Sequence, residues 1–174
     1  MRLATSALLA SVLGFSALPA AAGPQFLDGT GFAVSGHDVV AYFDLEQTPV
    51  GTAQPAAVAG RSDITAEYNG ATFAFSSEEN RDRFLADPAA YVPKYDGHCA
   101  FGVAKGGKVP GNPELWRIVD GKLYLNITSE VVGFWEEDIP GNLELSEANW
   151  TSLEPQPASD RPNPTDESDA PLTN

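Results

Sequence analysis

The sequence predicts a small α+β domain with two β-hairpins, several short helices and a C-terminal helical extension. Two pairs of strand-like segments are each joined by a two-residue turn, Asn69-Gly70 and Asp120-Gly121. Asn-Gly and Asp-Gly accept the positive φ angles of the type I′ turn that closes a tight hairpin. The segments between and after the hairpins carry helix-start signals and apolar clusters, which predict short helices.

Composition and charge fit one soluble domain with extensions. The chain has 174 residues, of which 43% are hydrophobic and 20% are charged, enough apolar material for one core. The net charge of −14 repels phosphate backbones and anionic lipid, so we expect neither nucleic-acid nor anionic-membrane binding. A cationic partner and a merely solvated acidic surface both remain compatible with this charge.

Residues 1–22 have the features of a secretory signal peptide. Arg2 precedes an apolar run over residues 3–18, and the small residues Ala20 and Ala22 predict cleavage before Gly23. The alternative is a retained membrane anchor. Polar or small residues interrupt the run, namely Ser6, Ser11, Gly14 and Ser16, which makes it a poor membrane span. We therefore expect a periplasmic or secreted protein with no stable membrane insertion after signal removal.

The first half of the expected domain leads into a hairpin. Residues 23–36 form a glycine-rich lead-in, and residues 38–43 combine β-branched and aromatic residues, which predicts a strand. A loop is expected over residues 47–61. The first hairpin then joins residues 64–68 to residues 71–75, where Phe and small residues alternate.

Helices and the second hairpin follow. Ser76 and Glu79 form a capping box that predicts a helix to about Ala86, and Asp87-Pro88 predicts a further helical turn. The second hairpin joins residues 115–119 to residues 122–126.

The domain is expected to span residues 37–151. A helix is predicted over residues 128–139, ended by the segment 138–141, and a last short helix over residues 142–150. Residues 152–174 are rich in Pro, Ser, Asp and Glu, which predicts a disordered acidic tail.

Chemistry is most plausible around residues 91–103, which hold the single cysteine, Cys99, beside His98. A lone cysteine in an exported chain is either buried and inert, paired with another molecule, or a reactive thiol. If Gly97 ends the preceding turn and a helix begins there, Cys99 lies at the helix N-terminus, which lowers a thiol pKa. A buried cysteine that acts as a small hydrophobe is an equal alternative.

A metal site would need ligands from distant segments. No C-x-x-C, H-x-x-x-H or H-E-x-x-H motif occurs. A copper or zinc site is conceivable from Cys99, His98 and His37, provided that folding brings the His37 loop to Cys99. Neighbours such as His98 and Cys99 point in different directions on a helix and on a strand, so His98 is poorly placed as a base for Cys99.

Several segments in order resemble the YHS domain family. They are Gly36-His-Asp-Val-Val-Ala-Tyr-Phe43, Tyr68-Asn-Gly-Ala-Thr-Phe-Ala-Phe-Ser-Ser77, Asn80-Arg-Asp-Arg-Phe-Leu-Ala-Asp-Pro88 and Tyr95-Asp-Gly-His-Cys-Ala100. Later stretches over residues 116–126, 138–141 and 148–150 resemble exported bacterial members described as YHS domain-containing (seleno)proteins. The resemblance implies an α+β fold of hairpin plus helix and, in cysteine-bearing members, metal binding.

The chain departs from the family at the positions that bear cysteine. Cys-bearing members carry patterns similar to D-P-V-C and F-C-S-x-x-C. At the three cysteine positions of these patterns, this chain has Ala41, Ser76 and Asn80. Neutral Ser and Asn are poor ligands for soft metals. Cys99 remains, in a segment where the subgroup label points to selenocysteine in relatives and hence, by analogy, to thiol chemistry.

Three functions follow as hypotheses. The favoured one is an exported, non-enzymatic module that binds or traffics copper or zinc, or meets a metal-bearing periplasmic partner, through Cys99 with His98 or His37. The second is a thiol redox protein with Cys99 as its catalytic residue. The third is a structural or interaction domain without metal, in which Cys99 only packs.

Overall fold

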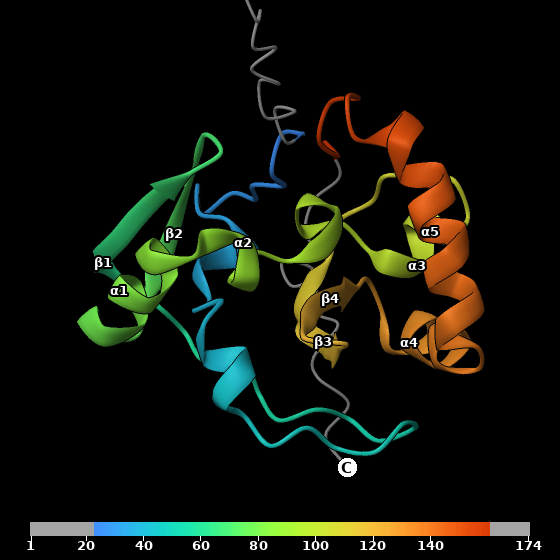
Figure 1. Cartoon of the computed structure of the whole chain (residues 1–174), viewed down its shortest axis with the longest axis horizontal. Coiled ribbons are helices and arrows are strands. Elements are labelled where there is room, and N and C mark those ends of the chain that lie inside the picture. The colour runs from blue at the N-terminus through green and yellow to red at the C-terminus, as the bar shows by residue number, and fades with distance from the viewer. Residues whose placement is uncertain (1–22, 161–174) are drawn as a thin grey trace, which may run out of the picture.

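The computed structural model describes residues 23–160, and the expected signal peptide 1–22 and residues 161–174 of the expected tail lie outside the described residues. The fold is α+β, as predicted (Figure 1). Its elements are β1 (Arg61–Tyr68), β2 (Ala71–Phe75), α1 (Glu78–Ala86), α2 (Pro88–Tyr91), α3 (Ala100–Ala104), β3 (Asn112–Val119), β4 (Lys122–Asn126), α4 (Ser129–Glu136) and α5 (Ile139–Leu153), with short 3-10 helices η1 (Val34–Gly36), η2 (Ala41–Asp44) and η3 (Lys94–Gly97). Over residues 23–160, no helix is long and apolar enough to span a bilayer.

Both predicted hairpins are confirmed. β1 pairs antiparallel with β2, and β3 pairs antiparallel with β4, as two separate two-stranded sheets. The turn residues have positive φ angles, 50° at Asn69 and 76° at Gly70, then 49° at Asp120 and 69° at Gly121. Two successive positive φ angles are what a type I′ turn requires.

The strand expected over residues 38–43 is wrong, since this segment turns and enters η2. The cause is the carboxylate of Asp38, whose Oδ1 accepts hydrogen bonds from the N–H groups of Val40 at 2.9 Å and Ala41 at 3.2 Å. An Asp side chain that binds the backbone N–H groups two and three residues ahead favours a turn over a strand.

Two helix starts also differ from the prediction. Ser77, and not Ser76, caps α1 by accepting from the N–H of Asn80, because Ser76 bonds to Asp38 instead. Asp138 caps α5, and Pro140 lies in its first turn. The segment 138–141 therefore begins a helix and does not end one, consistent with the tolerance of Pro at helix starts.

The C-terminal boundary expected at residue 152 lies inside α5. Beyond this helix, Nζ of Lys108 donates to the backbone carbonyl of Gln156 at 2.9 Å. The backbone N–H of Ser159 donates to the ring of His98 at 3.1 Å. These contacts join residues 156 and 159 to the domain.

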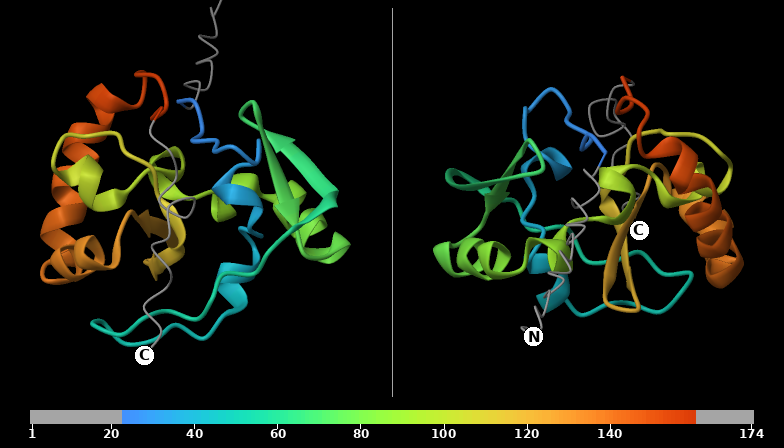
Figure 2. Two further views of the ribbon diagram at one scale, coloured as in Figure 1. Left: turned by 180° about the vertical axis from the view of Figure 1, so that it is seen from behind. Right: turned by 45° about the horizontal axis from the view of Figure 1, so that its top comes forward.

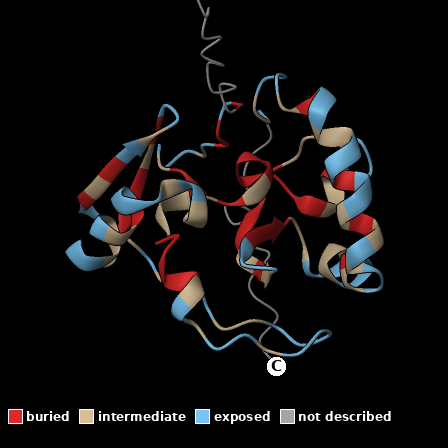
Figure 3. Cartoon of the chain, viewed as in Figure 1, coloured by how far each residue is buried: buried red, intermediate tan, exposed pale blue. Residues whose placement is uncertain are grey.

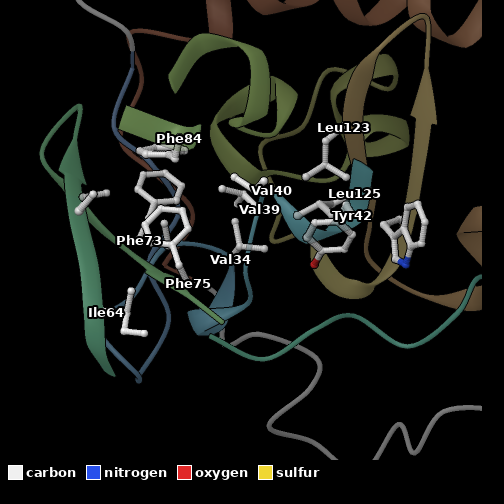
Figure 4. Packing of buried hydrophobic residues seen from close by; sticks show 14 residues of the cluster. Val34, Val39, Val40, Tyr42, Ile64, Phe73, Phe75, Phe84, Leu123 and Leu125 are labelled. Carbon is white, nitrogen blue, oxygen red and sulfur yellow. The ribbon is translucent and has the colours of Figure 1, made fainter. Parts of the chain in front are cut away.

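The two hairpins share one apolar core. In the views of Figure 2, the β1–β2 hairpin with α1 lies at one end of the molecule, α5 lies at the other, and β3–β4 lies between them. Figure 4 shows Leu123 and Leu125 of β4 beside Val39, Val40 and Tyr42, with Phe73, Phe75 and Phe84 continuing the cluster. A second cluster packs α5 against α3 and β4; its buried members are Tyr95, Ala100, Val103, Tyr124, Trp135 and Leu153. The central segments are accordingly buried, and the outer face of α5 is exposed (Figure 3).

Candidate functional site

Cys99 is a buried helix cap. It is the N-cap residue of α3, its side chain is inaccessible to solvent, and its Sγ accepts a hydrogen bond from the N–H of Gly102 at 3.3 Å. The thiol lies 3.5 Å from Oδ1 of Asn126, to which it donates. Asn126 Oδ1 also accepts from the N–H of Phe101.

Burial sets the ionisation of this thiol. It raises the pKa of Cys99, and the backbone N–H groups that favour thiolate, led by that of Gly102, offset only part of the effect. The thiol is therefore protonated at neutral pH. The lowered pKa that a helix N-terminus would give is not realised, because α3 has only five residues and its cap is withdrawn from water.

His98 is also buried, and both of its ring nitrogens are engaged. Nδ1 donates to the carbonyl of Tyr95 at 2.8 Å, and Nε2 accepts from the N–H of Ser159 at 3.1 Å. This network fixes the neutral Nδ1–H tautomer. Burial lowers the pKa of His98 to about 4, and the nearby charge of Lys108 lowers it as well. A metal ion would have to displace one of the two hydrogen bonds.

His37 has separate surroundings. Its Nδ1 lies 3.1 Å from the carbonyl oxygen of Val34, and its Nε2 lies 3.5 Å from Oε1 of Glu114. It pairs with Ala59 in an isolated β-bridge, whereas Cys99 pairs with Leu125.

The predicted ligand set of Cys99, His98 and His37 is therefore not assembled. Over residues 23–160, no group of three or more His, Cys, Asp or Glu side chains is arranged to hold a metal ion. The physical reason is that each of the three side chains makes polar contacts in its own surroundings. Although residues 98 and 99 are adjacent, their polar atoms form hydrogen bonds with different partners.

The positions where the family resemblance implies cysteines do converge, but around a carboxylate. Oδ2 of Asp38 accepts three hydrogen bonds, from the N–H of Ser76 at 2.8 Å, the Oγ–H of Ser76 at 2.6 Å and Nδ2 of Asn80 at 2.7 Å. Its Oδ1 accepts the N–H groups of Val40 and Ala41. Asp38 is inaccessible to solvent.

This arrangement does not fit a soft metal ion. A site for copper or zinc needs thiolate or imidazole lone pairs that face one point. Here the groups of Ser76 and Asn80 that converge are N–H and O–H donors, and the position between them is already occupied by the carboxylate of Asp38. A buried ion with five hydrogen bonds is well compensated, so the network joins the residue 38–41 turn to β2 and α1 as a structural tie.

The sequence analysis missed Asp38 and also Asp96, a second buried carboxylate. Asp96 is 9% exposed and lies in η3 with a φ of 54°. The signals were present: an Asp immediately before the apolar Val39-Val40, and an Asp-Gly pair after the aromatic Tyr95. Each pattern favours a turn in which the Asp side chain binds the backbone nearby.

Comparison with known proteins finds a YHS domain at residues 54–95. The matched segment contains β1, β2, α1 and α2, and it includes Ser76 and Asn80. His37, His98 and Cys99 all lie outside it. No curated protein and no solved structure gives a match.

Proposed function

We propose that this chain, with its YHS domain, is an exported, non-enzymatic structural and interaction module that works without a metal ion at the family's cysteine positions. The observation that carries the proposal is the set of five hydrogen bonds around Asp38, made by residues 40, 41, 76 and 80. The residues at the three cysteine positions, Ala41, Ser76 and Asn80, donate hydrogen bonds to this carboxylate. A module that keeps the fold but has hydrogen-bond donors in place of metal ligands serves as a scaffold.

The state of Cys99 supports the same function. Redox and nucleophilic cysteines are thiolate-rich and accessible. Cys99 has no solvent exposure, and burial raises its pKa, so the sulfur serves packing and the capping of α3.

Export is part of the proposal and rests on the sequence alone. Arg2, the apolar run and the Ala20-x-Ala22 site support secretion to the periplasm or the exterior. The similarity of residues 95–100 and 116–126 to exported bacterial members supports membership of that subgroup. The partner is then an exported protein.

Binding of copper or zinc is the second candidate, favoured by the YHS domain at residues 54–95. It would need a site other than the set of Cys99, His98 and His37.

The two candidates are separated by metal titration. The mature protein is titrated with Cu(I), Cu(II) and Zn(II), in parallel with Cys99→Ala and His37→Gln variants. We expect no stoichiometric site and the same weak binding in all three proteins. One tightly bound metal ion per chain would overturn the proposal; loss of that ion in either variant would place it at Cys99 or His37, and its retention in both would place it at another site. A Cys99→Ser variant that is less stable but binds an identified partner unchanged would support it.

A further inference from the structure

One oxygen of the buried Asp96 carboxylate has no hydrogen-bond partner. Oδ1 accepts from Nε2 of Gln25 at 2.8 Å, whereas Oδ2 is enclosed with no donor within the described part of the chain. An unsatisfied buried carboxylate oxygen is costly. Burial accordingly raises the pKa of Asp96 to about 6. The group needs a donor, and a cation would serve best.

The backbone of Gly23 is packed against this oxygen. A Cβ placed on Gly23 would lie 2.6 Å from Oδ2 of Asp96 and 2.4 Å from the carbonyl oxygen of Glu154. Only glycine fits there. The following residues hold the segment in place, since Phe26 donates its N–H to the carbonyl of Asp96 at 2.8 Å and Gln25 bonds the side chain.

Gly23 is also the residue that the signal-peptide pattern places first in the mature chain. Hydrolysis of the Ala22–Gly23 peptide bond by a leader peptidase consumes one water and leaves a carboxylate on Ala22. The new amine of Gly23 takes up a proton to become an ammonium. A neutral N–H donor thereby becomes a cation with three donors, on a residue that packs against Oδ2 of Asp96 and the carbonyl oxygen of Glu154.

We propose that the α-ammonium of Gly23, created by leader cleavage, binds to Oδ2 of Asp96 and the carbonyl oxygen of Glu154, the two atoms against which Gly23 packs. The proposal rests on the export put forward above. It assigns a binding site for the chain's own new terminus, and its consequence is that the processed protein is more stable than the same chain with the leader bond intact.

Other charges near the site are compatible with this ion pair. Lys108 and the Glu154 carboxylate act on Asp96 in opposite directions. The Lys108 ammonium is already engaged by the backbone carbonyls of Leu153, Glu154 and Gln156. The α-ammonium therefore donates to Oδ2 of Asp96, which Lys108 leaves unpaired. This contact joins the lead-in to the C-terminal end of α5, and the two segments lie near each other at the top of Figure 1.

The test compares three chains that all end at Asn174: one that starts with free Gly23, one with acetylated Gly23, and one that starts at Ala22. Each contains every described element, which all lie within residues 23–160. The readouts are the pKa of the Gly23 amine, followed by NMR of ¹⁵N-labelled glycine, and the thermal unfolding midpoint. Each chain is also made as Asp96→Asn, with Glu154→Gln as the matched control that keeps the Glu154 carbonyl.

We expect the amine pKa to rise above the ordinary range of about 7.7–8.0. The acetylated and extended chains should unfold about 5 °C lower than the free-amine chain. Asp96→Asn should abolish this difference, and Glu154→Gln should retain it. An amine pKa in the ordinary range, measured on the folded Asp96 protein, overturns the proposal even if Asp96→Asn fails to fold. N-terminal sequencing of the exported protein that finds another first residue also overturns it. Neither result bears on the metal titration, so the two proposals fail separately.

Discussion

Nδ2 of Asn80 donates a 2.7 Å hydrogen bond to Oδ2 of Asp38, which joins α1 to a turn 42 residues earlier in the chain. Asn80 occupies a position where the family resemblance implies a cysteine. In this chain the residue at that position takes part in a structural tie, and the first two predictions concern this tie.

Removal of the central carboxylate should be strongly destabilising. Asp38→Ala leaves the N–H groups of Val40, Ala41 and Ser76 without their acceptor in a buried place. We expect a loss of about 3 kcal/mol in the free energy of unfolding, measured by urea denaturation. Asp63→Ala is the control, since its side chain is 66% exposed, and it should cost no more than about 0.5 kcal/mol. Equal effects of the two variants would refute the structural role of Asp38.

Restored thiols should create a metal site. Oγ of Ser76 and Nδ2 of Asn80 lie 3.4 Å apart and both contact Asp38. The double variant Ser76→Cys/Asn80→Cys then offers two thiolates and a carboxylate, a donor set suited to Zn(II). We expect one Zn(II) per chain in the double variant and none in Ser76→Cys alone, measured by competition with a chromogenic chelator. Failure of the folded double variant to bind zinc would show that the two positions do not converge.

The thiol of Cys99 should be unreactive in the native protein. Its burial and raised pKa leave neither access nor thiolate for a disulfide reagent. Modification with an aromatic disulfide should be at least about a hundredfold slower in native buffer than in urea, because local opening must come first. Rapid native labelling, or sulfenate formation with dilute peroxide, would restore the redox hypothesis.

His98 should titrate far below its ordinary range. Its folded-state pKa of about 4 lies below the ordinary 6.5, so between these values the folded protein binds fewer protons than the unfolded chain. The stability from neutral His98 is therefore complete above pH 6.5 and is lost as the pH falls towards 4, by an amount on the order of 3 kcal/mol.

The measurement follows the imidazole by NMR in a His37→Gln variant, which leaves only one histidine. In a chain without the Gly23 ammonium, Asp96 acts in the opposite sense over this range, since its raised pKa makes its contribution fall as the pH rises from 3.8 to 6. The stability–pH slope must therefore be compared with that of His98→Gln. A His98 pKa near 6.5 would contradict the buried neutral ring.

A buried ion pair should hold the long loop before β1. Nε of Arg117 donates to Glu136 at 2.7 Å, and the guanidinium also donates to the carbonyl of Thr48 at 3.1 Å. Both side chains of the pair are 6% exposed. Arg117→Ala leaves the Glu136 charge buried and should cost about 3–5 kcal/mol, measured by urea denaturation. Arg61→Ala is the exposed control and should change little; a small effect of Arg117→Ala would show that water replaces the guanidinium.

Local signals in the sequence determined the hairpins, because Asn69-Gly70 and Asp120-Gly121 fix turn geometry through their own φ angles. They also determined the α+β class and the helix start near residue 77, whereas the segment 138–141, predicted to end a helix, begins α5. These features depend on residues a few positions apart, which a linear reading contains.

Only the tertiary structure decided the fates of Cys99, His98, Asp38 and Asp96. Whether a thiol ionises or an imidazole is free depends on desolvation and on partners that lie far away in the chain, such as Asn126 for Cys99 and Ser159 for His98. The same holds for the hydrogen bonds from Ser76 and Asn80 to Asp38. Burial is a property of the packed chain and not of any segment, so the sequence could name the residues that carry chemistry but not the state in which folding leaves them.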